Sequence, residues 1–404
     1  ASLLPSLAYV RSIVIPSGMG RIKTFLLVAA IAIIPTIAVW APFYLRTEKL
    51  WSIPLPVNGM QTVVANYDGP LYIVVAKTLY NKEAIVKNFS FDLPYEYYAA
   101  HFPLYPLTIR VISMVSGYVW GTLIATLLAA IFAHYYFYRF ALDMTKKEHL
   151  AVWLTMIFAV MPARWLIVRS VGSPEPLFVG AIIACLFHAR KKQYLLAGLF
   201  GAIAAMTKSP GILLLPALLI SILLPRFKEI VTTHNMGKFI KSLHISSIAV
   251  FLIPMGLLAV FALYQVQFGT FFAYFNSGDN IHLFFPPFQI FNFSQPWVGT
   301  HWLEEIIFIY LIIALGLSRL IAQKEWLLAW FVGIFFGVIL FVSHRDVLRY
   351  ALPTIPFVIL AFRDQLVKRE FVFVMLLLII PIYLFSIVFI VNNVMPIGDW
   401  TPLL

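Results

Sequence analysis

Runs of apolar residues long enough to cross a lipid bilayer recur along this sequence. A helix needs roughly 20 apolar residues to span a hydrocarbon core of about 30 Å. Of the 404 residues, 62% are hydrophobic and 11% are charged, whereas water-soluble domains average about 45–50% and about 25%. These figures exclude a water-soluble globular domain. The 36 Phe and 19 Tyr residues also exclude a disordered chain, because they provide ample apolar surface to bury.

The apolar runs predict about eleven membrane helices in one all-α polytopic domain that covers residues 1–404. No period of 20–50 residues repeats along the chain, which excludes a repeat array. Two of the runs are short for a crossing, and the turn between them is expected below the outer surface, at the floor of a pocket. The predicted helices lie near residues 24–45, 118–140, 149–167, 174–189, 193–207, 210–225, 239–266, 303–321, 325–342, 348–362 and 370–391, of which 193–207 and 210–225 are the short pair.

The distribution of charge predicts the orientation. The net charge is +12, and the basic residues cluster between apolar runs, as the positive-inside rule requires. We therefore expect membrane lipids, and no nucleic acid, as partners. Residues 103–117 contain Arg110 and are short; counting them as a crossing would place the clusters at 146–147 and 190–192 outside. We predict that this segment lies flat on the outer interface, with the N-terminus inside and the C-terminus outside.

This orientation predicts two large extracytoplasmic segments. Residues 46–117 contain an amphipathic stretch near 70–86 and the flat helix, and residues 268–302 are rich in aromatic side chains. Both segments are too apolar for ordinary solvated loops. We expect them to lie on or in the membrane surface.

Asp68 follows the first predicted membrane helix, in the sequence Asn66-Tyr67-Asp68-Gly69-Pro70. One interpretation is a structural helix cap, because Asp caps well and Pro suits the first helical turn. The other is a general base. The two are compatible, since a cap is held rigidly and a general base must be positioned.

Two helix starts on the predicted outer side favour an anion. Ser173–Pro176 and Lys208–Gly211 each place a Ser before a Pro, a pattern typical of a capped N-terminus. Helix N-termini attract phosphate, and Lys208 would add a positive charge. The alternative is two ordinary caps and a lysine that extends toward the interface.

A third basic segment, His344–Tyr350, opens the tenth predicted helix. Arg345 and Arg349 are four residues apart and are expected on one helix face, where paired guanidinium groups suit a phosphate. The alternative is a pair of interfacial arginines, one of them bound to Asp346. Arg164 and Arg169 are weaker candidates of the same kind, and Arg110 is expected to pack or to contact lipid.

His101 precedes the flat helix in the sequence His101–Pro106. It could bind a ligand or donate a hydrogen bond, although a lone His in such a place is usually structural. The chain contains no metal-ligand spacing, P-loop, dinucleotide fingerprint or nucleophile elbow. We therefore expect neither a metal nor a cofactor.

These segments together resemble the GT-C superfamily of membrane glycosyltransferases, and most of all the family of GPI mannosyltransferase 2. The resemblance covers residues 60–215, with a weaker echo at 344–353. Tyr67 replaces the family's usual Trp, Lys208 replaces its usual Arg, and Pro174 and Pro210 are atypical. These departures leave the acceptor open and suggest a prokaryotic relative. Tyr67–Gly69 resembles its aromatic-Asp-Gly/Ser element, His101–Pro106 its Phe-Pro-Leu-Tyr-Pro, Ser173–Phe178 its Ser-Glu-Ser-Leu-Phe, and Ala205–Gly211 its Thr-Arg-Ser-Asn-Gly.

The resemblance implies a GT-C type bundle with interfacial helices on the outer face. It implies transfer of a sugar, mannose by analogy, from a polyprenyl-phosphate donor to a hydroxyl of a lipid or glycan acceptor. Asp68 would be the general base. The active site would face outward from the plasma membrane of a prokaryote, or into the lumen from an ER membrane. The donor phosphate would be held by Lys208, Arg345 and Arg349, and His101, Tyr67, Glu175, Ser209 and His344 would contact the substrates.

Two alternatives remain open. A flippase or transporter of lipid-linked sugars would also have many helices, although transporters often show related halves and a charge near mid-membrane. A GT-C transferase of another sugar is the second alternative.

Overall fold

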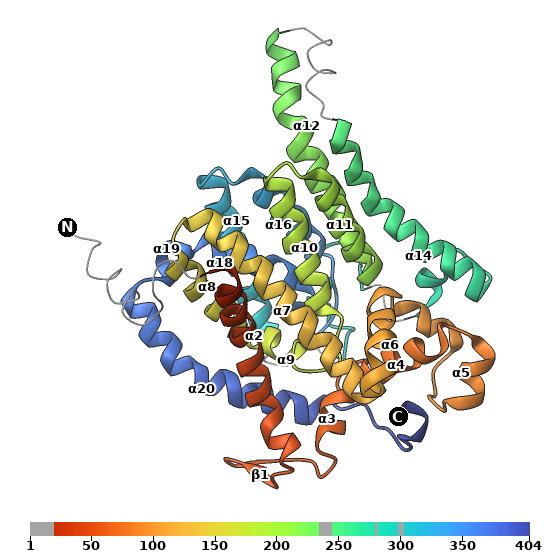
Figure 1. Ribbon diagram of the computed structural model, residues 1–404. Coiled ribbons are helices and arrows are strands. Elements are labelled where there is room, and N and C mark those ends of the chain that lie inside the picture. The colour runs from red at the N-terminus through yellow and green to blue at the C-terminus, as the bar shows by residue number, and fades with distance from the viewer. Residues whose placement is uncertain (1–19, 234–244, 279–281, 297, 299–302) are drawn as a thin grey trace. The chain divides into compact units, whose positions relative to one another are not determined.

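The computed structural model describes residues 20–233, 245–278, 282–296, 298 and 303–404. Over these residues the chain is mainly helical (Figure 1). The strands in this part of the chain are β1 (Lys49–Leu50) and β2 (Ile53–Pro54), which form a small antiparallel hairpin. The all-α class predicted from the sequence is confirmed.

Six helical segments in the described residues are long and apolar enough to cross a membrane. Shorter helices account for the remaining predicted segments, so that each of the eleven apolar runs overlaps with helix in the described residues. Residues 239–244 of the run predicted at 239–266 lie outside the described part of the chain. The chain is an integral, multi-pass membrane protein. The long segments are α2 (Arg21–Tyr44), α7 (Tyr118–Thr145), Ser209–Arg226 of η2 (Ser209–Leu213) and α12 (Leu214–Thr233), Ile245–Phe268 of η3 (Ile245–Phe251) and α14 (Leu252–Phe268), α15 (Leu303–Ala322) and α20 (Arg369–Asn392).

Prolines divide two of the predicted helices, because proline lacks an N–H donor and clashes with the preceding turn. The run at 149–167 forms α8 (Glu148–Val160) and α9 (Ala163–Val168), separated at Pro162. The run at 348–362 is divided near Pro353. It forms α17 (Val347–Ala351), η6 (Leu352–Thr354) and α18 (Ile355–Ala361).

Of the two short helices predicted at 193–207 and 210–225, the structure confirms the first as short. Helix α11 (Tyr194–Thr207) has 14 residues and is therefore about 21 Å long. The prediction for 210–225 is wrong, because α12 continues through Pro225 to Thr233. The remaining elements are α3 (Met60–Val64), α4 (Gly69–Thr78), α5 (Lys82–Asn88), η1 (Tyr95–Ala100), α6 (Leu104–Ser116), α10 (Glu175–Arg190), η4 (Ala273–Asn276), η5 (Gln289–Phe291), α16 (Trp326–Ile339), α19 (Arg363–Leu366) and η7 (Thr401–Leu403).

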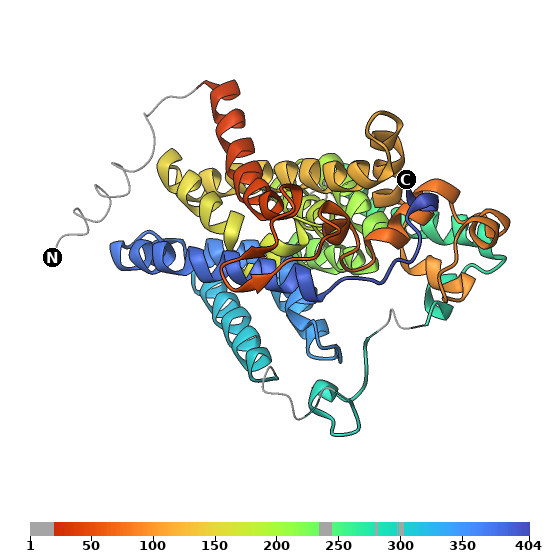
Figure 2. The same cartoon turned by 90° about the horizontal axis from the view of Figure 1, so that it is seen from below.

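The chain forms two compact units. The first consists of Ala1–Gly180, Leu263–Ser277 and Arg363–Leu404, and the second of Ala181–Ala262 and Gly278–Phe362. In the first unit α2 packs against α7 and α8, α6 packs against α4 and α7, and α20 packs against α9. The crossing of α2 (red) and α7 (yellow to orange) is visible in Figures 1 and 2. In the second unit α15 packs against α16 and α18, α12 against α16, and α11 against η3.

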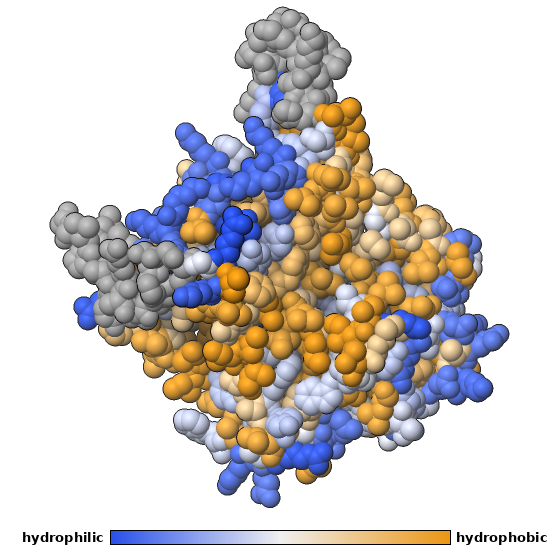
Figure 3. Space-filling model, in the orientation of Figure 1, coloured by the Kyte–Doolittle hydropathy of each residue, from blue (hydrophilic) through white to orange (hydrophobic). Residues whose placement is uncertain are grey.

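Hydrophobic side chains cover the face of the first unit shown in Figure 3, over α2 and α7. Polar residues gather below them, near the β1–β2 hairpin. A continuous apolar surface of this kind is expected where helices contact lipid rather than water.

The predicted flat helix is α6, over Leu104–Ser116. Its Tyr105 and Ile109 are buried, whereas the apolar side chains of Val111, Met114 and Val115 are exposed. One side of α6 therefore packs within the first unit, and its flat position at the outer interface stays a prediction. Arg110 donates from Nη1 to the carbonyl oxygens of Ala76 and Lys77 at 2.9 and 3.1 Å. The packing role expected for Arg110 is confirmed.

The amphipathic stretch predicted near 70–86 differs from the structure. Residues 69–76 of α4 are all buried, so the apolar character of this stretch reflects packing inside the first unit rather than contact with a membrane surface. The segment 268–302, which was predicted to be extracytoplasmic, contains η4 and η5 and exposes Phe285 and Phe293. Its residues 279–281, 297 and 299–302 lie outside the described part of the chain.

Candidate functional site

Asp68 lies in a tight turn between α3 and α4. The Gly69 amide donates to the Asn66 carbonyl at 3.1 Å, and Tyr67 has a left-handed backbone with φ of 50°. The buried Asn66 side chain donates from Nδ2 to the carbonyl oxygens of Thr62 and Ile390, each at 2.9 Å. The turn is therefore tied to the last turn of α20.

Gly69 is required by close approach of two backbones. A Cβ at Gly69 would lie 2.1 Å from the carbonyl oxygen of Val64, and a Cβ at Gly172 would lie 3.4 Å from the Gly69 Cα. The loop before α10 thus packs directly on the Asp68 turn. This close contact explains why a glycine follows Asp68 in the aromatic-Asp-Gly element named above.

The Asp68 side chain does not cap α4. Asp68 occupies the N-cap position, but its side chain forms no capping hydrogen bond. Its Oδ2 lies 3.9 Å from Nε2 of His101, and the carboxylate is 35% exposed. The capping interpretation is therefore wrong with respect to the side chain. The carboxylate is left facing an imidazole and solvent, as a general base requires.

His101 is 2% exposed and is held on several sides. The Tyr80 hydroxyl donates to the His101 carbonyl oxygen at 2.5 Å. The imidazole meets the ring of Tyr72 edge-on at 4.8 Å. Tyr72 lies one turn after Asp68 in α4, so its ring and the carboxylate both reach the same histidine.

Buried polar contacts continue from Tyr72 toward α10. Tyr72 meets Tyr105 edge-on at 5.0 Å, and the Tyr105 hydroxyl shares a hydrogen bond of 2.6 Å with Thr126 Oγ1. Thr126 Oγ1 in turn accepts from the amide of Ser173 at 3.3 Å. Burial raises the pKa of the Tyr105 hydroxyl, which therefore remains protonated at neutral pH.

Glu175 closes this chain of contacts. The Ser173 hydroxyl donates to Oε2 of Glu175, and the Ser173 oxygen accepts from the Glu175 amide at 3.4 Å. Helix α10 begins at Glu175 and its first backbone bond, from the Phe178 amide, goes to the Pro174 carbonyl. Ser173 therefore lies one residue before the N-cap position, in contrast to the prediction. Glu175 is itself buried.

Tyr67 points to a different group of side chains. Its hydroxyl accepts from Arg164 Nη1 at 3.0 Å, and its ring lies 5.7 Å from that of Phe389. The Arg164 guanidinium stacks on Phe389 at 3.9 Å. Tyr67 and Asp68 thus belong to two neighbouring clusters.

Lys208 and Ser209 lie in the second unit, where α11 ends and η2 begins. Lys208 has an extended backbone, and its carbonyl oxygen accepts from the Gly211 amide at 3.0 Å. Ser209 is the first residue of η2 and does not act as its cap, in contrast to the prediction. Gly211 is needed here, because a Cβ would lie 2.4 Å from the Ala205 amide nitrogen.

The segment 344–350 also lies in the second unit. Helix α17 begins at Val347, with Asp346 as its N-cap. Arg345 is therefore outside the helix and exposed, and the predicted common helix face with Arg349 is wrong. His344 Nδ1 accepts from the Asp346 amide at 2.9 Å, and the His344 ring lies 4.4 Å from that of His282.

Several residues of the Asp68 cluster were not predicted from the sequence. Tyr72 could have been found, since it lies four residues after Asp68 on the same helix face. Tyr105 belongs to the Phe-Pro-Leu-Tyr-Pro element. Thr126 gave no signal, because a threonine within an apolar helix is common. Among the described residues, no group of three or more His, Cys, Asp or Glu could hold a metal ion.

The fold is shared with a solved membrane protein. The crystal structure of ArnT from Cupriavidus metallidurans bound to undecaprenyl phosphate is similar, with a TM-score of 0.53 and 11% sequence identity. The similarity covers 89% of this chain and 77% of the ArnT chain. The chain has a GT-C fold. No protein-family model matches the sequence, and no curated protein sequence matches it.

Proposed function

We propose that this protein is a glycosyltransferase that moves a sugar from a polyprenyl-phosphate donor to a hydroxyl, with inversion, and that Asp68 is its general base. The observation that carries the proposal is the Asp68 carboxylate. It sits on a rigid turn, makes no capping bond and faces His101 at 3.9 Å while remaining 35% exposed. A general base in such a position contributes about 10²–10⁴-fold to the rate.

His101 and Glu175 are proposed to position the reacting groups. Both side chains are almost completely buried, which leaves little of their surface for a substrate. His101 faces Asp68 directly, and Glu175 holds the loop at Ser173 that packs, through Gly172, on the Asp68 turn. Tyr67, beside Asp68, is proposed to contact the substrate together with Arg164.

The donor phosphate is proposed to bind Lys208, Arg345 and Arg349. Cationic side chains stabilise the negative charge that grows on the leaving phosphate oxygen. Ser209 and His344 adjoin these cations in the sequence and are proposed to contact the donor. The fold supports this class of donor, because the similar ArnT structure contains undecaprenyl phosphate.

The finer features of the proposal come from the resemblance. Mannose is the proposed sugar, the acceptor is a lipid or a glycan, and the site faces the extracytoplasmic side. The reaction needs no metal, because the phosphate's charge is met by cationic side chains; inhibition by EDTA would contradict this feature.

The proposal is tested by incubating the purified protein in detergent with labelled polyprenyl-phosphate mannose. We expect transfer to an acceptor or slow hydrolysis of the donor. If the protein instead only moves the lipid across reconstituted vesicles, it is a flippase. Transfer from another polyprenyl-phosphate sugar but not from the mannose lipid would retain the reaction and replace the sugar.

A further inference from the structure

Arg169 is a fully buried arginine in the first unit, at the C-terminal end of α9. Its exposed fraction is 0%. Its Nη1 donates to the carbonyl oxygen of Ala32 in α2 at 2.7 Å. Its Nε and Nη2 are also buried, but they have no hydrogen-bond partner among the described residues.

No carboxylate within the described chain pairs with this guanidinium. An arginine remains charged in proteins, and an unpaired buried charge is strongly unfavourable. Two unused N–H groups on a buried cation therefore indicate a missing acceptor that carries negative charge.

Trp165 presents another unused donor beside Arg169. The Arg169 amide donates to the Trp165 carbonyl at 3.1 Å, so the two side chains lie one helical turn apart on the same face of α9. Trp165 is 1% exposed, and its Nε1 is buried without a partner. Buried indole N–H groups normally find an acceptor.

His134 of α7 completes the cluster. Its ring lies 6.1 Å from that of Trp165, and it is close enough to Arg169 for the two to interact electrostatically. Its Nδ1 donates to the Ala130 carbonyl at 2.7 Å, because a carbonyl can only accept. Its Nε2 is buried and has no partner. With the proton on Nδ1, Nε2 can only accept, so His134 lines the cluster without adding a donor.

We propose that Arg169, Trp165 and His134 enclose a binding site for a small monovalent anion such as chloride. The anion accepts hydrogen bonds from Arg169 Nε and Nη2 and from Trp165 Nε1, and it neutralises the guanidinium. Arg169 precedes Gly172 by three residues in the chain, and the backbone of Gly172 packs on Gly69. The anion therefore stabilises the loop that supports the Asp68 turn.

The test is thermal unfolding of the detergent-solubilised protein, with chloride replaced by gluconate at constant ionic strength. Chloride should raise Tm by about 1–3 °C for each tenfold increase above its dissociation constant, and bromide should act similarly.

Trp165→Phe keeps the aromatic ring and removes one hydrogen-bond donor. It should shift the dependence of Tm on chloride to several-fold higher chloride concentrations. Arg110→Gln, which removes a guanidinium bonded to backbone carbonyls, is the matched control and should retain the full dependence.

Arg169→Met should abolish the response. If that variant does not fold, a crystal grown in bromide provides a second measurement, with an anomalous peak expected beside the Arg169 guanidinium. A Tm of the wild-type protein that does not change with chloride concentration, or density for water molecules alone in this cluster, would overturn the proposal.

Discussion

At the scale of single residues, the candidate site depends on the contact between Asp68 and His101. The carboxylate was identified from its place after the first helix and from the resemblance. The contact with His101 could not be derived, because no sequence rule brings a residue of a turn to the start of an interfacial helix. The free Asp68 side chain could not be foreseen either, since Asp before Gly-Pro is typical of a cap.

The buried His101 should affect the rate more than substrate binding. We expect His101→Phe, which keeps an aromatic ring against Tyr72, to lower kcat at least tenfold and to leave KM within about threefold. The pH–rate profile should also change, because phenylalanine has no ring nitrogen to face the Asp68 carboxylate. Steady-state kinetics over a range of pH measure this. His149→Phe, a histidine of α8 with no proposed role, should behave like the wild type. A pure KM effect in His101→Phe would make His101 a substrate ligand instead.

Gly69 offers a steric test of the turn. In Gly69→Ala the new Cβ would meet the Val64 carbonyl oxygen at 2.1 Å, so the backbone must shift at a cost of about 1–3 kcal/mol. We expect a lower Tm and loss of transfer. Gly337→Ala is the control, because nothing lies within 4 Å of a Cβ there, and it should be neutral or slightly stabilising. Equal behaviour of the two variants would contradict the close packing at Gly69.

At the scale of elements, hydrophobic runs located the helices well, because lipid requires that every backbone group be satisfied within the segment. The errors have local causes. Pro162 and Pro353 divide helices that a hydropathy average joins, whereas Pro225 is accommodated within α12. The apolar α4 was assigned to the membrane surface because hydropathy does not distinguish lipid contact from burial.

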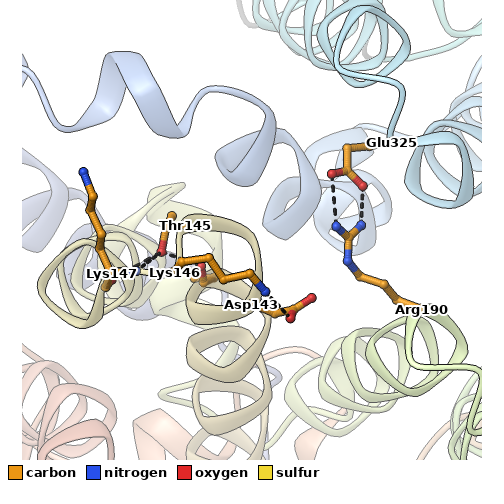
Figure 4. A network of polar contacts seen from close by, with 7 residues as sticks. Asp143, Thr145, Lys146, Lys147, Arg190 and Glu325 are labelled. Carbon is orange, nitrogen blue, oxygen red and sulfur yellow. Dashed lines mark hydrogen bonds and ion pairs between the residues drawn. The ribbon is translucent and has the colours of Figure 1, made fainter. Parts of the chain in front are cut away.

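Two ion pairs, Arg190–Glu325 and Lys146–Asp143, differ in how much they are expected to stabilise the helices that carry them (Figure 4). Arg190 binds both carboxylate oxygens of Glu325 and joins the end of α10 to the start of α16, with side chains 29% and 18% exposed. Lys146, the C-cap of α7, binds Asp143 in the last turn of that helix; the lysine side chain is 74% exposed and the aspartate 11%. Solvent and salt screen the second pair far more than the first.

Double-mutant cycles should separate the two pairs. We expect a coupling free energy of about 1 kcal/mol or more between Arg190→Gln and Glu325→Gln, since the bidentate pair is partly shielded. The cycle of Lys146→Gln with Asp143→Asn should give about 0–0.5 kcal/mol. Denaturant unfolding in mixed micelles measures both values. A coupling no larger for Arg190–Glu325 than for Lys146–Asp143 would show that α10 and α16 are held by apolar packing alone.

At the scale of the whole molecule, composition was sufficient to establish a polytopic membrane protein, and the order of four short motifs was sufficient to indicate a GT-C fold. The substrates were not accessible in this way. The sugar and the acceptor depend on side chains that contact bound ligands, and such contacts leave no periodic signal in the sequence. The proposed activity therefore depends on Asp68, the carboxylate that the resemblance implies as the base and that is 35% exposed in the structure.

The most direct test compares Asp68→Asn with Asp92→Asn, which changes an exposed aspartate within the same segment, residues 46–117. The measurement is the rate of sugar transfer from labelled polyprenyl-phosphate mannose, together with donor binding and Tm. We predict that Asp68→Asn loses about 10²–10⁴-fold in transfer with donor affinity and Tm nearly unchanged, and that Asp92→Asn retains wild-type activity. Full transfer by Asp68→Asn would contradict its role as the general base.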